Sequence, residues 1–307
     1  MFSFRAALPI LVALPFMHGC GASVDSTDAA VAADLAVDPA RDADAAPRDA
    51  APNDGAPTDA APDQATVNRC NRPVSSVPSE LGADAFYAKY LDADGIPVLA
   101  SAQVRDAALQ RACAVVLRML SARRDVRDEL LVWGIHVAII GVDELTTDIP
   151  EYATLYEDFP GVDWNARARG LGATATLRLS SVGEENLLGL PGDVHEGEDI
   201  MVHEFAHTFF DLGVRSTAEG TVYRDRLQSA YNASLREGRY ADTYALSETR
   251  EYFAESVQSW FDVNLEAEPA DGVHNFVNTQ EELRLYDPAM AEILEELFPA
   301  SLDLPAG

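Results

Sequence analysis

The sequence predicts an α+β domain with a small mixed N-terminal lobe and a mainly helical C-terminal lobe. Three observations support this fold class. Ile135–Ile140 is a short apolar run that ends at a glycine, as a buried strand does. Apolar residues recur at helical spacing before it, between Ser101 and Arg123. After residue 197, signals for the start and end of helices follow one another toward the C-terminus.

We expect residues 1–68 to lie outside this domain. Residues 1–19 resemble a lipoprotein signal peptide: Arg5 precedes an apolar run that is too short to span a bilayer, and a small residue stands before Cys20. A lipid on Cys20 would anchor the protein in the outer membrane of a Gram-negative bacterium. An ordinary secretory signal cut near Ala22 would instead give a secreted protein.

Residues 20–68 are predicted to form a disordered tether. They are rich in Ala, Asp and Pro and hold ten aspartates against two arginines. Such a segment cannot bury enough apolar surface to offset the entropy of ordering, and its charge keeps it extended. Residues 69–307 are then long enough for one domain or for two lobes around a cleft.

Charge and cysteine content narrow the possible partners. The net charge is −29 and there is no basic cluster, so nucleic-acid binding is not expected. With Cys20 assigned to the lipid, two of the three cysteines remain, Cys70 and Cys113. In an exported protein such a pair predicts a disulfide.

The N-terminal lobe is expected to contain the following elements in order. Ser101 caps a helix that runs to Arg123, and a short helix covers Asp125–Trp133. The buried strand Ile135–Ile140 comes next, and residues 142–171 form a long loop because they lack periodicity. Thr174–Ser180 alternates polar and apolar residues, which predicts a half-exposed edge strand able to hold the backbone of a substrate peptide.

His203-Glu204-Phe205-Ala206-His207 is the most informative motif in the chain. Residues four apart on a helix lie above one another, so His203 and His207 can reach the same metal ion. Glu204 can then act as a general base on a water whose pKa zinc lowers to about 7. The surrounding residues are apolar and Gly213 fits the end of the helix, as expected for a buried zinc helix.

The C-terminal lobe is predicted to be helical. Its helices are expected at Thr217–Arg236, from a cap at Ser247 or Thr249 to Phe261, from a capping box at Thr279–Glu282, and from Asp287-Pro288 onward.

A catalytic zinc site needs a third protein ligand. A third histidine at the metzincin distance is excluded, because Phe210 and Gly213 stand where that pattern needs glycine and histidine. Glu248, Glu251 and Glu255 share one face of a later helix, and their spacing does not choose among them.

Glu-Tyr-Phe-Ala-Glu at 251–255, after His-Glu-Phe-Ala-His, resembles the gluzincins of the anthrax lethal factor type and the secreted Pro-Pro endopeptidases. The chain is still more similar to a group of uncharacterised secreted bacterial and fungal zinc-peptidase-like proteins. The shared short motifs lie between residues 169 and 290: Arg169-Gly170-Leu171-Gly172, Glu185-Asn186-Leu187-Leu188, Glu198-Asp199-Ile200, Tyr244-Ala245, Gln258-Ser259 and Tyr286-Asp287-Pro288.

This resemblance implies a zincin-like fold with an active-site helix, and a zinc-dependent endopeptidase as the function. It assigns Glu255 as the third zinc ligand beside His203 and His207, with Glu204 as the base. It also implies an oxyanion-stabilising tyrosine, for which Tyr244 is the candidate, with Tyr240 and Tyr252 as competitors.

Several alternatives stay open at the level of sequence. Glu251 could orient a histidine through its free N–H, and His195 and His274 are further possible site residues. The chain could also be a non-catalytic zinc-containing surface binding or adhesion module. A zinc hydrolase of a non-peptide substrate is the third possibility.

Overall fold

The structure is a computed structural model that describes residues 69–302. The predicted signal peptide, the lipid site at Cys20 and the tether lie outside the described residues. Within residues 69–302, none of the helices combines the length and the apolar character needed to cross a membrane.

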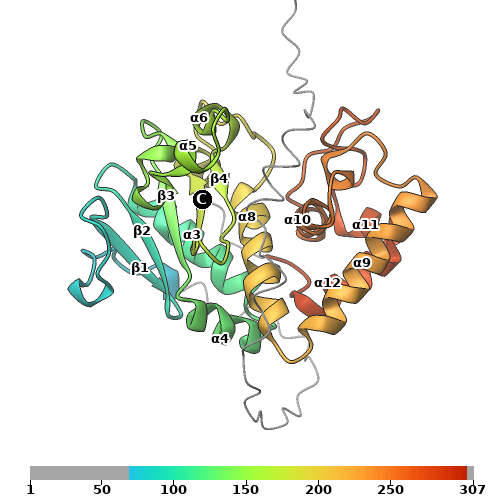
Figure 1. The fold of residues 1–307 in the computed structure, drawn as a ribbon, viewed down its shortest axis with the longest axis horizontal. Coiled ribbons are helices and arrows are strands. Elements are labelled where there is room, and N and C mark those ends of the chain that lie inside the picture. The colour runs from blue at the N-terminus through green and yellow to red at the C-terminus, as the bar shows by residue number, and fades with distance from the viewer. Residues whose placement is uncertain (1–68, 303–307) are drawn as a thin grey trace, which may run out of the picture.

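A five-stranded mixed sheet forms the N-terminal lobe, in the order β1-β2-β3-β5-β4. The central strands β2, β3 and β5 run parallel, and the outer strands β1 and β4 pair antiparallel to their neighbours. Figure 1 shows this sheet on one side of the molecule and the C-terminal helices on the other. The strands are β1 (Lys89–Ala93), β2 (Ile96–Ala100), β3 (His136–Ile140), β4 (Gly170–Leu171) and β5 (Leu179–Gly183).

The predicted helices are present, and the α+β class is confirmed. The α-helices of the first lobe are α3 (Asp106–Met119), α4 (Arg124–Trp133), α5 (Leu155–Asp158), α6 (Trp164–Arg167) and α7 (Glu184–Leu188). Those that follow are α8 (Ile200–Thr208), α9 (Gly220–Glu237), α10 (Thr249–Trp260), α11 (Gln280–Tyr286) and α12 (Pro288–Leu297). Short 3-10 turns occur at Ser79–Leu81, Thr146–Asp148, Pro150–Tyr152, Val214–Ser216 and Tyr244–Leu246.

Capping side chains set the starts of α8, α11 and α12. Asp199 accepts a hydrogen bond from the N–H of Val202 at the start of α8, and Asp287 caps α12 in the same way. The capping box predicted at Thr279–Glu282 opens α11. Ser101, by contrast, is not the cap of α3, because its hydroxyl accepts from the N–H of Gln103 in a tight turn.

The predicted edge strand Thr174–Ser180 is wrong in both position and exposure. Backbone and side-chain bonds between Thr174 and Leu177 close a turn in the middle of that segment. Strand β5 therefore starts only at Leu179, and it is buried between β3 and β4. The edge strand beside β5 is β4, which lies in the region expected to be a loop.

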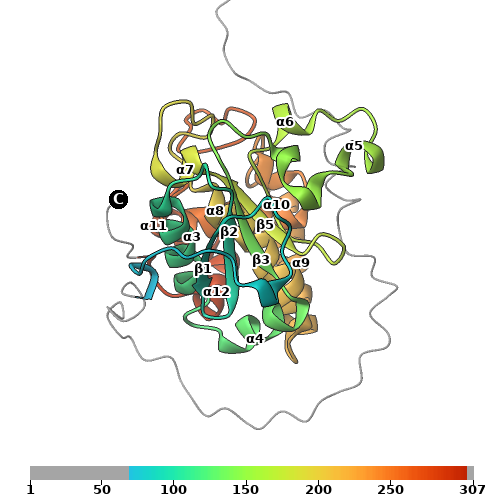
Figure 2. The same cartoon turned by 90° about the vertical axis from the view of Figure 1, so that its left-hand side faces the viewer.

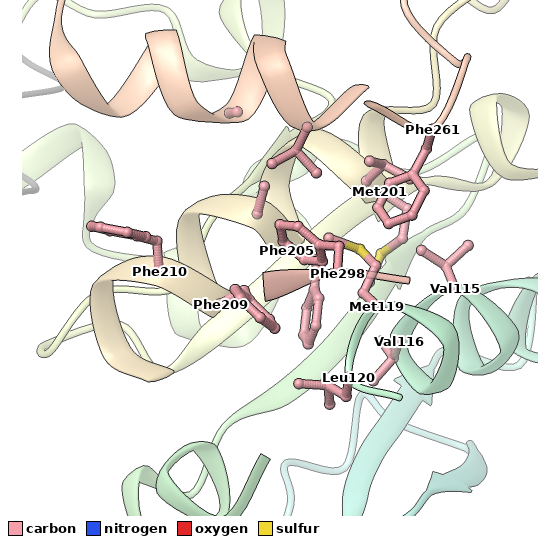
Figure 3. Close-up of a cluster of buried hydrophobic side chains, with 14 of the residues drawn as sticks. Val115, Val116, Met119, Leu120, Met201, Phe205, Phe209, Phe210, Phe261 and Phe298 are labelled. Carbon is pink, nitrogen blue, oxygen red and sulfur yellow. The ribbon is translucent and has the colours of Figure 1, made fainter. Parts of the chain in front are cut away.

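Helix α8 lies between the two lobes and packs on both (Figures 1 and 2). Met201, Phe205 and Phe209 belong to the same buried cluster as Val116 and Met119 of α3 (Figure 3). The helix continues beyond Thr208 as a π-helical turn, Phe209–Gly213. The centre of its Phe210 ring lies 4.6 Å from that of Phe253 on α10, with the two rings tilted. The histidine helix is therefore fixed on both sides by apolar packing.

The disulfide predicted between Cys70 and Cys113 is present, with their Cα atoms 5.8 Å apart. It joins the first described residues to α3.

Candidate metal centre

Three side chains converge on one point between α8 and α10. The Nε2 atoms of His203 and His207 lie 3.2 Å apart. An Oε2 atom of Glu251 lies 3.1 Å from the first and 3.3 Å from the second. Within the described residues these three form the group whose donor atoms are close enough to share a metal ion.

The spacing of these atoms fits a tetrahedral zinc ion. Zinc bonds to histidine nitrogen and carboxylate oxygen at about 2.0–2.2 Å, which separates ligand atoms by roughly 3.3 Å in a tetrahedron. All three side chains are buried, with the residues 8%, 6% and 5% exposed in the order His203, His207, Glu251. Two histidines and one carboxylate are also a set that catalytic zinc sites use, with the fourth position left for water or substrate.

The electrostatics of the group favour a positive charge at the same point. Burial opposes the charged form of His203, but the hydrogen bond and charge of Glu251 outweigh it and raise its pKa to about 10. Burial likewise opposes the charged form of Glu251, and the two histidines hold its pKa well below the usual range. A proton or a divalent cation can supply that charge.

Gln258 sets the tautomer of His203. Its amide nitrogen donates to the carbonyl of Asp199, so its oxygen faces the Nδ1 of His203 at 2.8 Å. Nδ1 therefore carries the hydrogen, and the lone pair of Nε2 points to the metal position. The sequence showed Gln258 only as part of a shared motif. The role of Gln258 depends on a contact between α8 and α10, which are distant in the sequence.

The structure places Glu251, not Glu255, with the two Nε2 atoms, contrary to the ligand implied by the resemblance. Glu251 and Glu255 are one helical turn apart on α10. Glu255 lies on the other side of the His203 ring, 3.5 Å from Nδ1, and accepts a hydrogen bond from Asn264. Burial raises the pKa of the Glu255 carboxyl. The third glutamate, Glu248, is only partly buried and lies outside the group.

Of the three tyrosines, Tyr244 is the one whose pKa responds to the charges of Glu251 and Glu204. Burial raises its pKa, and the charges of Glu251 and Glu204 raise it further, so its hydroxyl stays protonated near both groups. Tyr252 donates to the buried carboxylate of Asp287. Tyr240 is also buried, and its ring packs edge-on against those of Tyr252 and Tyr286.

His195 and His274 lie outside the metal group. The N–H of His195 donates to Asp193 in the loop before α8. His274 is buried, with its Nε2 3.3 Å from a carboxylate oxygen of Glu198.

Edge strand β4 lies directly against the middle of α8. A Cβ atom on Gly172 would lie 2.7 Å from the Cβ of His207, and one on Gly170 would lie 3.1 Å from the Cγ of Glu204. Only glycine leaves room for this approach. The strand is thus close to both the proposed base and one histidine of the metal group.

Arg169 anchors the start of β4. It makes two charge-assisted hydrogen bonds of 2.6 and 2.8 Å to the buried carboxylate of Glu185. It also donates to the carbonyl of Glu144, in the region predicted to be a long loop, and to that of Gly141 just before it. Two short motifs that are distant in the sequence therefore meet at one ion pair.

A cavity of about 480 Å³ lies at the N-terminal end of α8. Its walls are mainly loop residues 186–199, with Arg111 and residues 262–263. None of the three metal-group residues lines it, so we do not assign the substrate to it.

Comparison with known proteins adds little to this geometry. No protein-family model matches the chain, and a search of curated proteins finds no match. Among solved structures, the chain is similar to the Pro-Pro endopeptidase of Paenibacillus alvei, with 20% identity and a TM-score of 0.42. The match covers 66% of this chain and 97% of that one. We base no functional statement on a likeness at this level.

Proposed function

We propose that this chain is a zinc-dependent endopeptidase in which His203, His207 and Glu251 hold the metal. The observation that carries the proposal is the convergence of two imidazole nitrogens and one carboxylate oxygen at 3.1–3.3 Å from one another. A zinc ion held there supplies Lewis acidity and lowers the pKa of a water to about 7.

The residues around the metal group can carry the remaining steps. Glu204 follows the first histidine on α8, and its carboxylate can take a proton from the attacking water and return it to the leaving amine. The Tyr244 hydroxyl, kept protonated, can donate a hydrogen bond to the oxygen of the scissile carbonyl as negative charge develops. Strand β4 offers a sheet edge on which an extended peptide can lie beside Glu204.

Export and lipid attachment at Cys20 form a separate part of the proposal. They rest on the sequence of residues 1–68 alone.

Replacement of Glu204 by glutamine tests the function. The variant keeps the two histidines and Glu251, so we expect full zinc content together with a loss of peptide hydrolysis of at least about 100-fold. Internally quenched peptide pools measure hydrolysis, with and without chelator, and elemental analysis measures zinc. Wild-type hydrolysis in Glu204→Gln, or hydrolysis that survives removal of the metal, would sink the proposal.

A further inference from the structure

A second pocket adjoins the metal group on the side of His207. It has a volume of about 190 Å³ and lies where the π-helical turn after α8 meets the N-terminal parts of α9 and α10. His207 forms part of its wall, so the pocket reaches one of the three residues of the metal group. The pocket is lined by His207, Phe210, Asp211, Arg215, Arg224, Leu227, Gln228, Thr249, Arg250 and Phe253.

The residues that line this pocket carry a net positive charge, whereas the whole chain is negative. The protein has 51 acidic residues against 22 basic ones, but three arginines and one aspartate line the pocket. Arg250 is bound tightly to that aspartate, Asp211, at 2.6 Å. Arg215 reaches the same carboxylate only at 3.7 Å. Arg224 pairs with Asp225 at 3.0 Å, and both side chains are more than half exposed.

Arg250 is the arginine of the three that neighbouring carboxylates hold most tightly. Burial opposes the charge of Arg250, but Asp211, with Glu251 and Glu248, outweighs burial and raises the pKa of Arg250. Arg215 shares Asp211 with this stronger partner. The exposed ion pair of Arg224 contributes little, because water screens it. Among the lining residues, Arg215 and Arg224 therefore have the weaker ion pairs, one long and one exposed to solvent, and are the arginines best placed to bind an anion.

The other walls are apolar. Phe210, Leu227 and Phe253 are buried, and the rings of Phe210 and Phe253 pack against each other. Between the helices, Thr249 donates to the side-chain oxygen of Gln228. Apolar walls leave less water around a bound anion than open solvent does, which favours its hydrogen bonds to a guanidinium. The pocket suits a group with a short aliphatic stem and a carboxylate at its end.

We propose that this pocket is a subsite that binds a carboxylate of the substrate, with Arg215 and Arg224 as its specificity-determining residues. The inference rests on the proposed function, which makes the substrate a peptide. The carboxylate then belongs either to an acidic side chain or to the C-terminus of the peptide.

Cleavage of matched peptides tests the subsite. The probes are internally quenched alanine-leucine hexapeptide amides that carry glutamate or its isostere glutamine at one position at a time, together with the free-acid forms of the glutamine peptides. We expect the wild-type protein to favour glutamate at one position, or the free acid, by about tenfold in kcat/KM. In the Arg215→Gln/Arg224→Gln double variant this ratio should fall close to one.

Arg226→Gln is the matched control. Arg226 also lies on α9 but pairs with Glu296 on α12, so this variant should keep the wild-type ratio. A ratio measured within one variant cancels any general loss of activity. The subsite is refuted if the wild-type protein shows no preference for a carboxylate, or if the double variant keeps the preference.

Equilibrium binding separates this proposal from the proposed function. Fluorescein-labelled forms of the same peptides would be titrated with zinc-loaded Glu204→Gln protein. Tighter binding of the carboxylate peptides that is lost with Arg215→Gln/Arg224→Gln supports the subsite even if the wild-type protein hydrolyses none of them. Equal binding of all the peptides overturns it, whether or not hydrolysis occurs.

Discussion

The height of a carboxylate along α10 decides whether it can reach the metal position. Glu251 is level with the Nε2 atoms of both histidines, whereas Glu255 is one turn further on and faces the Nδ1 side of His203. Helical spacing correctly placed both glutamates on one face. It could not choose between them, because the choice depends on how α10 is positioned along α8.

Zinc affinity separates the two glutamates. Loss of an outer partner of a metal site lowers affinity by about 10–100-fold, and loss of a direct ligand should lower it further. We therefore expect Glu251→Ala to lose zinc in a chelator competition at which Glu255→Ala still binds it. Full zinc binding by Glu251→Ala, with loss in Glu255→Ala, would restore the ligand implied by the resemblance.

At the scale of secondary structure, local signals predicted helices better than strands. The capping residues at Asp287 and Thr279 are local, and both helices begin where they predict. Strand β4 has only two paired residues, so alternation could not reveal it. The hairpin β1–β2 was missed although Asp94-Gly95 stands at its turn, where both residues have positive φ.

Arg169→Lys tests whether the ion pair to Glu185 holds β4 beside α8. Lysine keeps the charge but cannot make the paired hydrogen bonds of a guanidinium. We expect faster hydrogen exchange of the amides at residues 170–173, and a larger fall in kcat/KM for long peptides than for short ones. Long peptides lose more because more of their main-chain bonds depend on the strand.

Arg226→Lys is the control for this change. Arg226 makes an equally close paired contact with Glu296, but on the exposed surface between α9 and α12. The Arg226→Lys variant should change neither the hydrogen exchange of the β4 amides nor the dependence of kcat/KM on peptide length. If Arg169→Lys also leaves both measurements at their wild-type values, the ion pair does not position the strand.

At the scale of the whole molecule, the architecture depends on contacts that no short segment encodes. The apolar run at Ile135–Ile140 predicted a strand, but not that it would lie between β2 and β5. The metal group needs α8 and α10, whose contacting residues are separated by 48 positions in the case of His203 and Glu251. The sequence therefore predicted the residue types of the site and the two helices that hold them. It did not predict how α10 is aligned along α8.

The disulfide is a long-range contact that the number of cysteines predicted, and its effect on stability can be measured. Cys70 and Cys113 close a loop with a sequence separation of 43 residues. The chain-entropy model gives such a loop about 4 kcal/mol of stabilisation, through restriction of the unfolded chain. We expect Cys70→Ala/Cys113→Ala to unfold at a lower urea concentration, with zinc content unchanged, because neither cysteine belongs to the metal group. Reductant should lower the midpoint of the wild-type protein and leave that of the double variant where it is. A shift equivalent to less than about 1 kcal/mol would show that the unfolded chain gains little freedom when the bond is absent.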